Sequence, residues 1–209
     1  MSAVFWFRRD LRLHDNLALN EAVRSSTSGA QESGSVTACY FFEHEAFASL
    51  LPIRQHSLNA SVRALDLAMN EKLNIRVVSN AQALAAELIA ICREVSATEV
   101  HASRMFDPAG IAQQNSVGLE LKAAGIYLRL TGSNYAVDPG TVRKPDGTPY
   151  RVYTPFYKAW LQAGWGEPED LPATQWQLLD GKCAFPIPSG PAPFEIRAGY
   201  DFALETFAK

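Results

Sequence analysis

Residues 3–16 of the chain read AVFWFRRDLRLHDN. The first five are apolar, as expected of a buried strand, and the charged residues Arg8, Arg9 and Asp10 follow at once. A strand that ends in this way carries its arginines and aspartates to one edge of a sheet. The residues alone support two interpretations of this charged turn. It is either a set of ion pairs that shapes the connection to the next helix or a ligand-binding site.

Further apolar runs alternate with helical patterns along the first 130 residues. The predicted strands cover residues 3–7, 36–42, 75–78, 99–102 and 126–130. Between them, apolar residues recur at helical spacing, for example from residue 58 to residue 69. Capping residues predict two helix starts, Asp15 for the first helix and Asp107, followed by Pro108, for the last.

Strands that alternate with helices predict a parallel sheet with helices on both faces. The expected fold class is α/β, a Rossmann-like doubly wound sheet of five parallel strands in the order 3-2-1-4-5. Such folds bind ligands beyond the carboxyl ends of the strands, where the strand order reverses. That point lies between the first and fourth strands, so residues 8–10 and 103–107 are the first candidates. Glu43 and His44, which follow the second strand, come next.

Proline divides the chain, since ten of its twelve prolines follow residue 131. The predicted parts are an α/β domain at 1–131, a hairpin and short helix closing that domain at 132–162, a proline- and glycine-rich interdomain linker at 163–198, and the start of a helical domain at 199–209. The hairpin is expected at Pro145-Asp146-Gly147, a common turn sequence. The polar residues 25–35 predict a surface loop.

Composition excludes several classes of protein. The chain has 209 residues, of which 47% are hydrophobic, and a net charge of −3, so it lacks the basic surface typical of nucleic-acid binding. Its three cysteines are far apart and its four histidines are scattered, so we expect no disulfide scaffold and no metal site. The reducing cytoplasm is the expected compartment. No apolar run approaches the ~18 residues of a membrane-spanning helix.

Four blocks of the sequence carry a family resemblance. FWFRRDLRLHDN at 5–16 resembles the N-terminal signature of the DNA photolyase/cryptochrome family. Three further blocks resemble that family in the same order and at suitable spacing: LNASVRAL at 58–65, VHASRMFDP at 100–108 and GTPYRVYTPFYKAW at 147–160. Together they cover the chain from residue 3 to the end of the last block, and the match resembles the family's N-terminal α/β domain and linker.

The resemblance implies a function. In this family the N-terminal domain commonly holds an antenna chromophore (a reduced folate, a deazaflavin or FMN), which passes light energy to FAD in a C-terminal helical domain. That second domain repairs pyrimidine dimers in DNA after the lesion flips out of the helix. The chain is therefore expected to be the light-harvesting domain of a deoxyribodipyrimidine photolyase. The alternatives are a cryptochrome-type photoreceptor domain and a stand-alone module that binds a nucleotide-like ligand.

The resemblance also implies partners. These are the C-terminal FAD-binding domain of the same protein and, through that domain, damaged DNA, with no membrane. The chain by itself is expected to be inactive in repair, because FAD belongs to the other domain. Apolar side chains at Phe202, Leu204, Phe207 and around 156–160 are then expected to form an exposed patch, which a weak dimer would cover.

Two sets of residues are candidates for the antenna site. In folate-binding members an acidic residue after the fourth strand binds the pterin amino edge, and Asp107 takes that place, with Phe106 and Ser103 near it. From the residues alone, Asp107 is also a plain helix cap. A deazaflavin or FMN would lie nearer the ends of strands one, two and four. The candidates there are Arg8, Asp10, Cys39, Glu43 and His44. No catalytic residue is expected.

Overall fold

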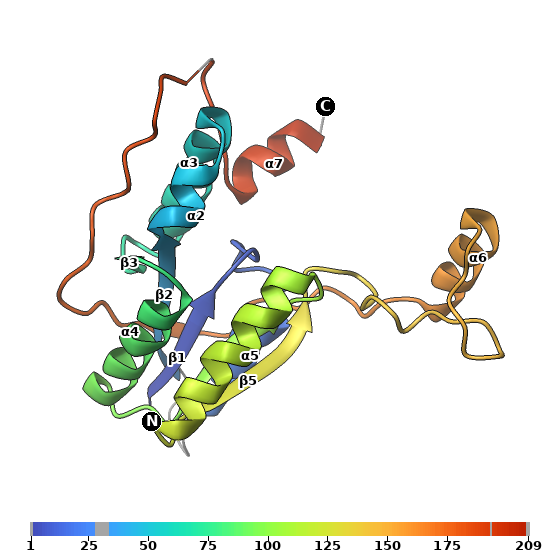
Figure 1. Ribbon diagram of the computed structural model, residues 1–209, viewed down its shortest axis with the longest axis horizontal. Helices are drawn as coiled ribbons and strands as arrows, with labels where there is room; N and C mark the ends of the chain where they lie inside the picture. Colours follow the sequence, from blue (N-terminus) through green and yellow to red (C-terminus); the bar gives the residue numbers. More distant parts are fainter. Residues whose placement is uncertain (1, 28–33, 193, 208–209) are drawn as a thin grey trace.

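The computed structural model describes residues 2–27, 34–192 and 194–207 (Figure 1). Five parallel strands form its centre: β1 (Ser2–Phe7), β2 (Gly34–Glu43), β3 (Asn74–Val78), β4 (Glu99–Arg104) and β5 (Tyr127–Ser133). Their order is β3-β2-β1-β4-β5, so the predicted fold class and strand order are confirmed. The order reverses between β1 and β4, where α/β sheets of this kind bind ligands.

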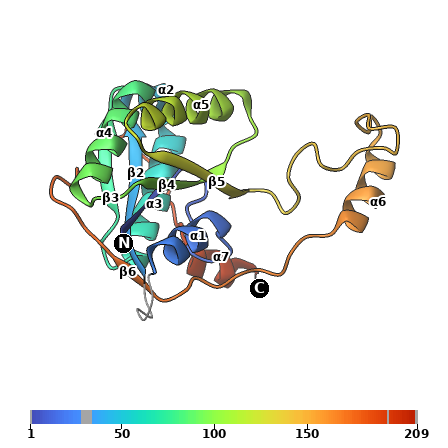
Figure 2. The same cartoon turned by 90° about the horizontal axis from the view of Figure 1, so that it is seen from below.

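Helices cover both faces of the sheet (Figure 2). One face carries α1 (Leu17–Ser26), α2 (His44–Ser49) and α3 (Pro52–Ala68), and the other carries α4 (Ala81–Glu94) and α5 (Pro108–Ala123). Successive side chains of β1 alternate between the two cores: Phe5 and Phe7 pack with α1 and α3, whereas Val4 and Trp6 pack with α4 and α5. Both faces of β1 are buried, which explains the continuous apolar run of this central strand. Within the described ranges, no helix is both long and apolar enough to cross a bilayer.

A buried carboxylate holds the turn that follows β1. Asp10 is 3% exposed, and its oxygens accept hydrogen bonds from the backbone N–H of Arg8 (2.9 Å), the hydroxyl of Ser103 (2.6 Å) and the amide of Asn16 (3.3 Å). These donors come from the end of β1, the end of β4 and the start of α1. Asp10 therefore ties together three elements at the point where the strand order reverses.

The start of α1 differs from the prediction. Asn16, not Asp15, caps the helix, because the Asn16 side-chain oxygen accepts from the backbone N–H of Leu19 at 3.1 Å. The same side chain donates to Asp10, and the chain reaches this arrangement with Asp15 at a φ of 50°. The α5 cap at Asp107 is confirmed. The loop predicted at 25–35 includes residues 28–33, which lie outside the described residues.

The predicted turn near residue 146 is present, but no hairpin strands flank it in the described part of the chain. The backbone N–H of Gly147 donates to the carbonyl of Lys144, and that of Lys144 donates to the carbonyl of Thr148. The helix that follows, α6 (Tyr153–Ala163), does not close the domain as predicted, because it stands away from the sheet in Figures 1 and 2.

Aromatic rings explain how α6 is organised without packing on the sheet. The ring centroids of Tyr153 and Tyr157 lie 5.7 Å apart, those of Tyr157 and Trp160 lie 6.3 Å apart, and those of Trp160 and Trp165 lie 4.9 Å apart. The rings therefore cover one another along one side of the helix. None of the residues of α6 is fully buried.

The linker at 163–198 is more firmly attached than its composition predicts. Residues Thr174–Trp176 form β6, which pairs in parallel with the first residues of β2. The buried side chain of Asn74 then holds the following segment, donating to the carbonyls of Ala38 (3.0 Å) and Gln177 (2.9 Å) and accepting from the backbone N–H of Leu179 (2.7 Å). One amide thus joins β2, β3 and the linker.

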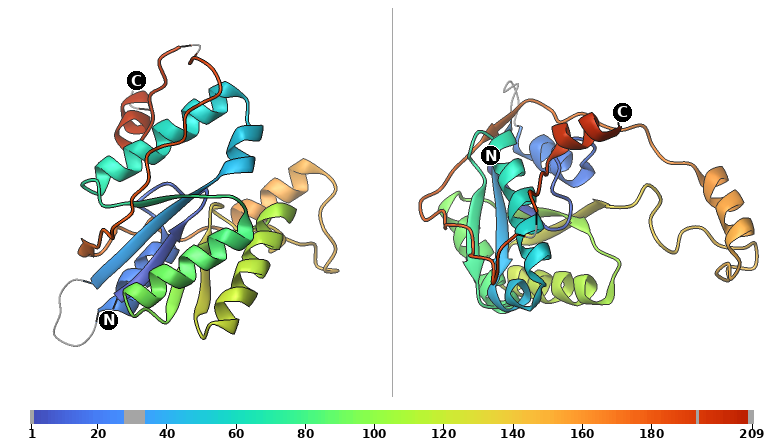
Figure 3. Two further views of the ribbon diagram at one scale, coloured as in Figure 1. Left: turned by 60° about the vertical axis from the view of Figure 1, so that its left-hand side comes forward. Right: turned by 90° about the horizontal axis from the view of Figure 1, so that it is seen from above.

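The linker continues along α3 to α7 (Tyr200–Phe207), as Figure 3 shows. Lys182 makes an ion pair with the buried Asp66 at 2.6 Å, and the ring of Tyr200 stacks on His14 with centroids 4.6 Å apart. Phe202 was also predicted to be exposed but is partly buried, with the Arg197 guanidinium over its ring, whereas Leu204 and Phe207 are exposed as predicted. They are separated from the exposed rings of α6, so the two helices form two apolar surfaces instead of one patch (Figure 1).

Replacing Ser103 tests the network around Asp10. Ser103→Ala should lower the free energy of unfolding by about 2 kcal/mol, because a buried carboxylate loses a charge-assisted hydrogen bond. Urea denaturation measures the change. The exposed Ser116→Ala on α5 is the matched control and should change stability by less than about 0.5 kcal/mol. Equal effects of the two substitutions would show that Asp10 does not need this donor.

Replacing Asn74 tests the attachment of the linker. Asn74→Ala should lower the free energy of unfolding by about 3 kcal/mol, because it removes the partner of three backbone groups at a buried position. The exposed Asn115→Ala serves as the control. A loss below about 1 kcal/mol would mean that the linker is held without this amide.

Candidate functional site

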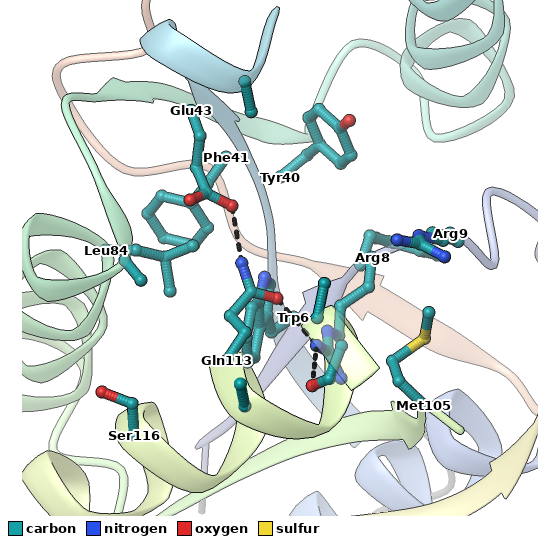
Figure 4. A pocket seen from close by; sticks show the side chains of 16 residues that line it. Trp6, Arg8, Arg9, Tyr40, Phe41, Glu43, Leu84, Met105, Gln113 and Ser116 are labelled. Atoms are coloured by element: carbon teal, nitrogen blue, oxygen red, sulfur yellow. Dashed lines mark hydrogen bonds between the residues drawn. The ribbon is translucent and has the colours of Figure 1, made fainter. Parts of the chain in front are cut away.

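A pocket opens at the carboxyl ends of β1 and β2, beside the first turns of α5 (Figure 4). Its volume is about 690 Å³, within the usual range of small-molecule sites. The apolar and aromatic lining includes Trp6, Phe7, Tyr40, Phe41, Leu84 and Met105. The polar lining includes Arg8, Arg9, Glu43, Gln113 and Ser116.

Arg8 brings a buried positive charge to this pocket. The residue is 8% exposed, and its guanidinium lies 4.6 Å from the centroid of the Trp6 ring. The guanidinium donates to the carbonyl of Gly110 (3.0 Å) and to the amide oxygens of Gln113 (2.7 Å) and Gln114 (3.2 Å). These acceptors are all neutral.

Among the described residues, no carboxylate pairs with the Arg8 guanidinium. Burial is the main cause that lowers the pKa of Arg8 to about 10, so the side chain remains a cation at neutral pH. A buried charge usually has a charged partner, because leaving water is costly for an ion. The pocket therefore contains a positive group that an anionic or strongly polar ligand atom can pair with.

Gln113 links this cation to the negative group of the pocket. Its amide oxygen accepts from Arg8, and its amide nitrogen donates to the Glu43 carboxylate at 2.5 Å (Figure 4). Gln113 and Gln114 were not identified from the sequence, because two glutamines on a helix carry no pattern of their own. Only the packing of α5 beside β1 shows their role.

Gly110 allows this close packing. A Cβ atom at Gly110 would lie 2.6 Å from the Cβ of Met105 and 2.7 Å from a carboxylate oxygen of Asp107. These distances are too short for any side chain, so glycine is required at this turn of α5. Its absence of a side chain lets the Gly110 carbonyl reach Arg8.

Four other predicted site residues, Asp10, Cys39, His44 and Ser103, do not line this pocket. Asp10 and Ser103 are buried and hydrogen-bonded to each other, and the buried Cys39 thiol donates to the carbonyl of Phe5 at 3.5 Å. Burial raises the pKa of the Cys39 thiol, which keeps it protonated. None of the three lines the pocket. His44 is exposed at the start of α2, outside the lining. Of the residues predicted to bind a deazaflavin or FMN, the pocket thus brings together Arg8 and Glu43.

Asp107 and Phe106, predicted to bind a folate, lie around the cap of α5. The Asp107 carboxylate accepts from the backbone N–H of Gly110 at 3.0 Å and pairs with Arg9 at 3.1 Å. The hydrogen bond from Gly110 is the main cause that lowers the pKa of Asp107. The Phe106 ring contacts the ring of Tyr135, with centroids 6.1 Å apart. A role of these residues in binding folate stays a prediction.

The pocket has the chemistry of a binding site for a planar, conjugated molecule. Aromatic and apolar side chains can cover the faces of a ring, while Arg8 and Glu43 offer a donor and an acceptor to one of its edges. The described parts of the chain contain no cluster of His, Cys, Asp or Glu side chains that could hold a metal ion.

Comparisons with known proteins agree with this fold. The family model described as DNA photolyase matches residues 3–175. The deoxyribodipyrimidine photo-lyase of Agrobacterium fabrum is 33% identical over 159 residues, which cover 75% of this chain and 31% of that protein. The chain thus spans about a third of the length of such curated relatives.

Solved structures show the same architecture. A bacterial class III photolyase from Agrobacterium tumefaciens matches with a TM-score of 0.69 and 28% identity, over 90% of this chain and 37% of that one. An archaeal photolyase from Sulfolobus tokodaii matches with a TM-score of 0.68 over 100% of this chain and 42% of that one; at 19% identity, this likeness concerns the fold alone. The chain belongs to the DNA photolyase family, in which it corresponds to the N-terminal α/β domain.

Proposed function

We propose that this chain binds a light-absorbing chromophore in the pocket at the ends of β1 and β2 and serves as the light-harvesting domain of a DNA photolyase. The observation that carries the proposal is the Arg8 cation, buried without a carboxylate partner beside a pocket of ligand size. Its hydrogen bonds go to neutral groups, so a polar atom of a ligand would add a further partner to this buried cation.

The lining residues fit a flavin-like ring. Trp6 and Phe41, which share one face of the sheet, would contact the ring, and Arg8 and Glu43 would bind its polar edge. When bound, the chromophore would supply absorption of light at wavelengths that the protein itself does not absorb. The Sulfolobus tokodaii photolyase, which shares this fold, holds two FAD molecules with the implication of a novel light-harvesting cofactor, and this supports a flavin as the class of chromophore.

A folate at the α5 cap has less support. The Asp107 carboxylate already accepts from Gly110 and pairs with Arg9, and the Ser103 hydroxyl is used by Asp10. A pterin edge would have to compete with these contacts. We therefore propose FMN or a deazaflavin as the class of chromophore, in preference to a reduced folate.

The activity and partners of a longer protein follow from the same proposal. Absorbed energy would reach FAD in a C-terminal domain, which would repair pyrimidine dimers in DNA. The exposed side chains of α7 and α6 would contact that domain. In the isolated chain these surfaces would support a weak dimer, which sedimentation velocity can detect. The matched relatives also include a plant cryptochrome, and a repair assay on the two-domain protein separates the two functions.

Filling the pocket tests the proposed function. Ala112 lies in the lining on α5, and its side chain is exposed. Ala112→Trp should weaken the binding of FMN by at least about tenfold, because an indole takes the space of the ring. Titration of FMN fluorescence, repeated with a deazaflavin, measures the affinity.

Ala123→Trp provides the control for that titration. It places the same side chain at an exposed position of the same helix, three turns from Ala112 and outside the pocket. Its affinity should equal that of the unmodified chain. Binding that is unaffected by either substitution would place the chromophore elsewhere, and no binding of either compound would contradict the proposal.

A further inference from the structure

Gln113 stands between the two charged groups of the pocket. Its amide oxygen lies 2.7 Å from a nitrogen of Arg8, and its amide nitrogen lies 2.5 Å from an oxygen of Glu43. The three side chains come from α5, the end of β1 and the end of β2 (Figure 4). One carboxamide therefore satisfies the donor and the acceptor that the pocket offers.

A carboxamide has the hydrogen-bonding geometry of a ring lactam. Its oxygen and nitrogen are bonded to the same carbon and lie roughly 2.3 Å apart, as the bond lengths of an amide require. One N–H of a primary amide points to the same side as its C=O. A six-membered ring locks a lactam in that arrangement too, whereas a backbone amide is trans. The pyrimidine-dione ring of flavins and deazaflavins has such an edge.

We propose that Gln113 occupies the place of the ligand's lactam edge and is the specificity-determining latch of the pocket. The inference rests on the proposed function, since it concerns the same site. In the closed state, Arg8 and Glu43 bind the Gln113 amide. When the chromophore enters, its C=O accepts from Arg8, its N–H donates to Glu43, and the Gln113 side chain turns away. Ligands without an adjacent C=O and N–H cannot replace the latch.

The surrounding contacts allow this exchange. Arg8 keeps its position without Gln113, because the carbonyl of Gly110 and the amide of Gln114 also accept from it. Gln114 is buried and bonded to the backbone N–H of Met105, so it cannot turn. Gln113 is only half-buried, and its side chain is hydrogen-bonded to Arg8 and Glu43, the two groups that the ligand would use. It is the one glutamine of the pair that is free to move.

The experiment compares riboflavin with 3-methylriboflavin, in which a methyl group replaces the hydrogen of the lactam N–H. Gln113→Ala should bind riboflavin about tenfold more tightly than the unmodified chain, since the ligand no longer displaces two hydrogen bonds. The affinity for 3-methylriboflavin should remain weak in both proteins. Asn115→Ala, at an exposed position of the same helix, is the control and should behave as the unmodified chain.

A second measurement uses the unmodified chain. The side-chain amide resonance of Gln113, assigned by its loss in Gln113→Ala, should shift on addition of riboflavin, while that of Gln114 should stay in place. Riboflavin that binds with equal affinity to the unmodified chain and Gln113→Ala, or that binds without shifting this resonance, would contradict the proposed role of Gln113. The proposed function would then stand. If no variant binds riboflavin, FMN or a deazaflavin, the proposed function is wrong and the latch with it.

Discussion

Asp10 is the side chain on which the geometry of the site depends. A carboxylate that is 3% exposed is costly to bury unless donors surround it, and here they come from the end of β1, the end of β4 and the cap of α1. These are the elements that meet where the strand order reverses. The hydrogen bonds to the Asp10 carboxylate fix the conformation of the turn after β1. This turn places the Arg8 side chain in the lining of the pocket.

The position of Arg8 then determines the rest of the pocket. Gly110 lets the first turn of α5 approach β1, so that its carbonyl and two glutamine side chains receive the guanidinium. Neutral acceptors hold the charge without cancelling it. The structure thus combines a firmly placed cation, an opposing carboxylate at Glu43 and aromatic walls. This combination suits recognition of a polar ring, and it does not require any reactive side chain.

The sequence predicted the centre of the sheet well, because burial on both faces leaves an apolar run in β1 and in β2. It did not predict β6, since three residues among prolines carry no periodic pattern. Arg8 and Glu43 were identified because they directly follow apolar runs. Gln113 was missed because its importance comes from the distance between α5 and β1, which is a property of packing. The helix α6 was expected to close the domain, but it stands away from the sheet, and its aromatic rings stack on one another.

A crystal structure of the chain with FMN bound tests the account most directly. The account predicts density for the ring beside Trp6 and Phe41, with its lactam edge on Arg8 and Glu43 and the Gln113 side chain turned out of the pocket. Density for the ring beside Phe106 and Asp107, with this pocket unchanged, would contradict it.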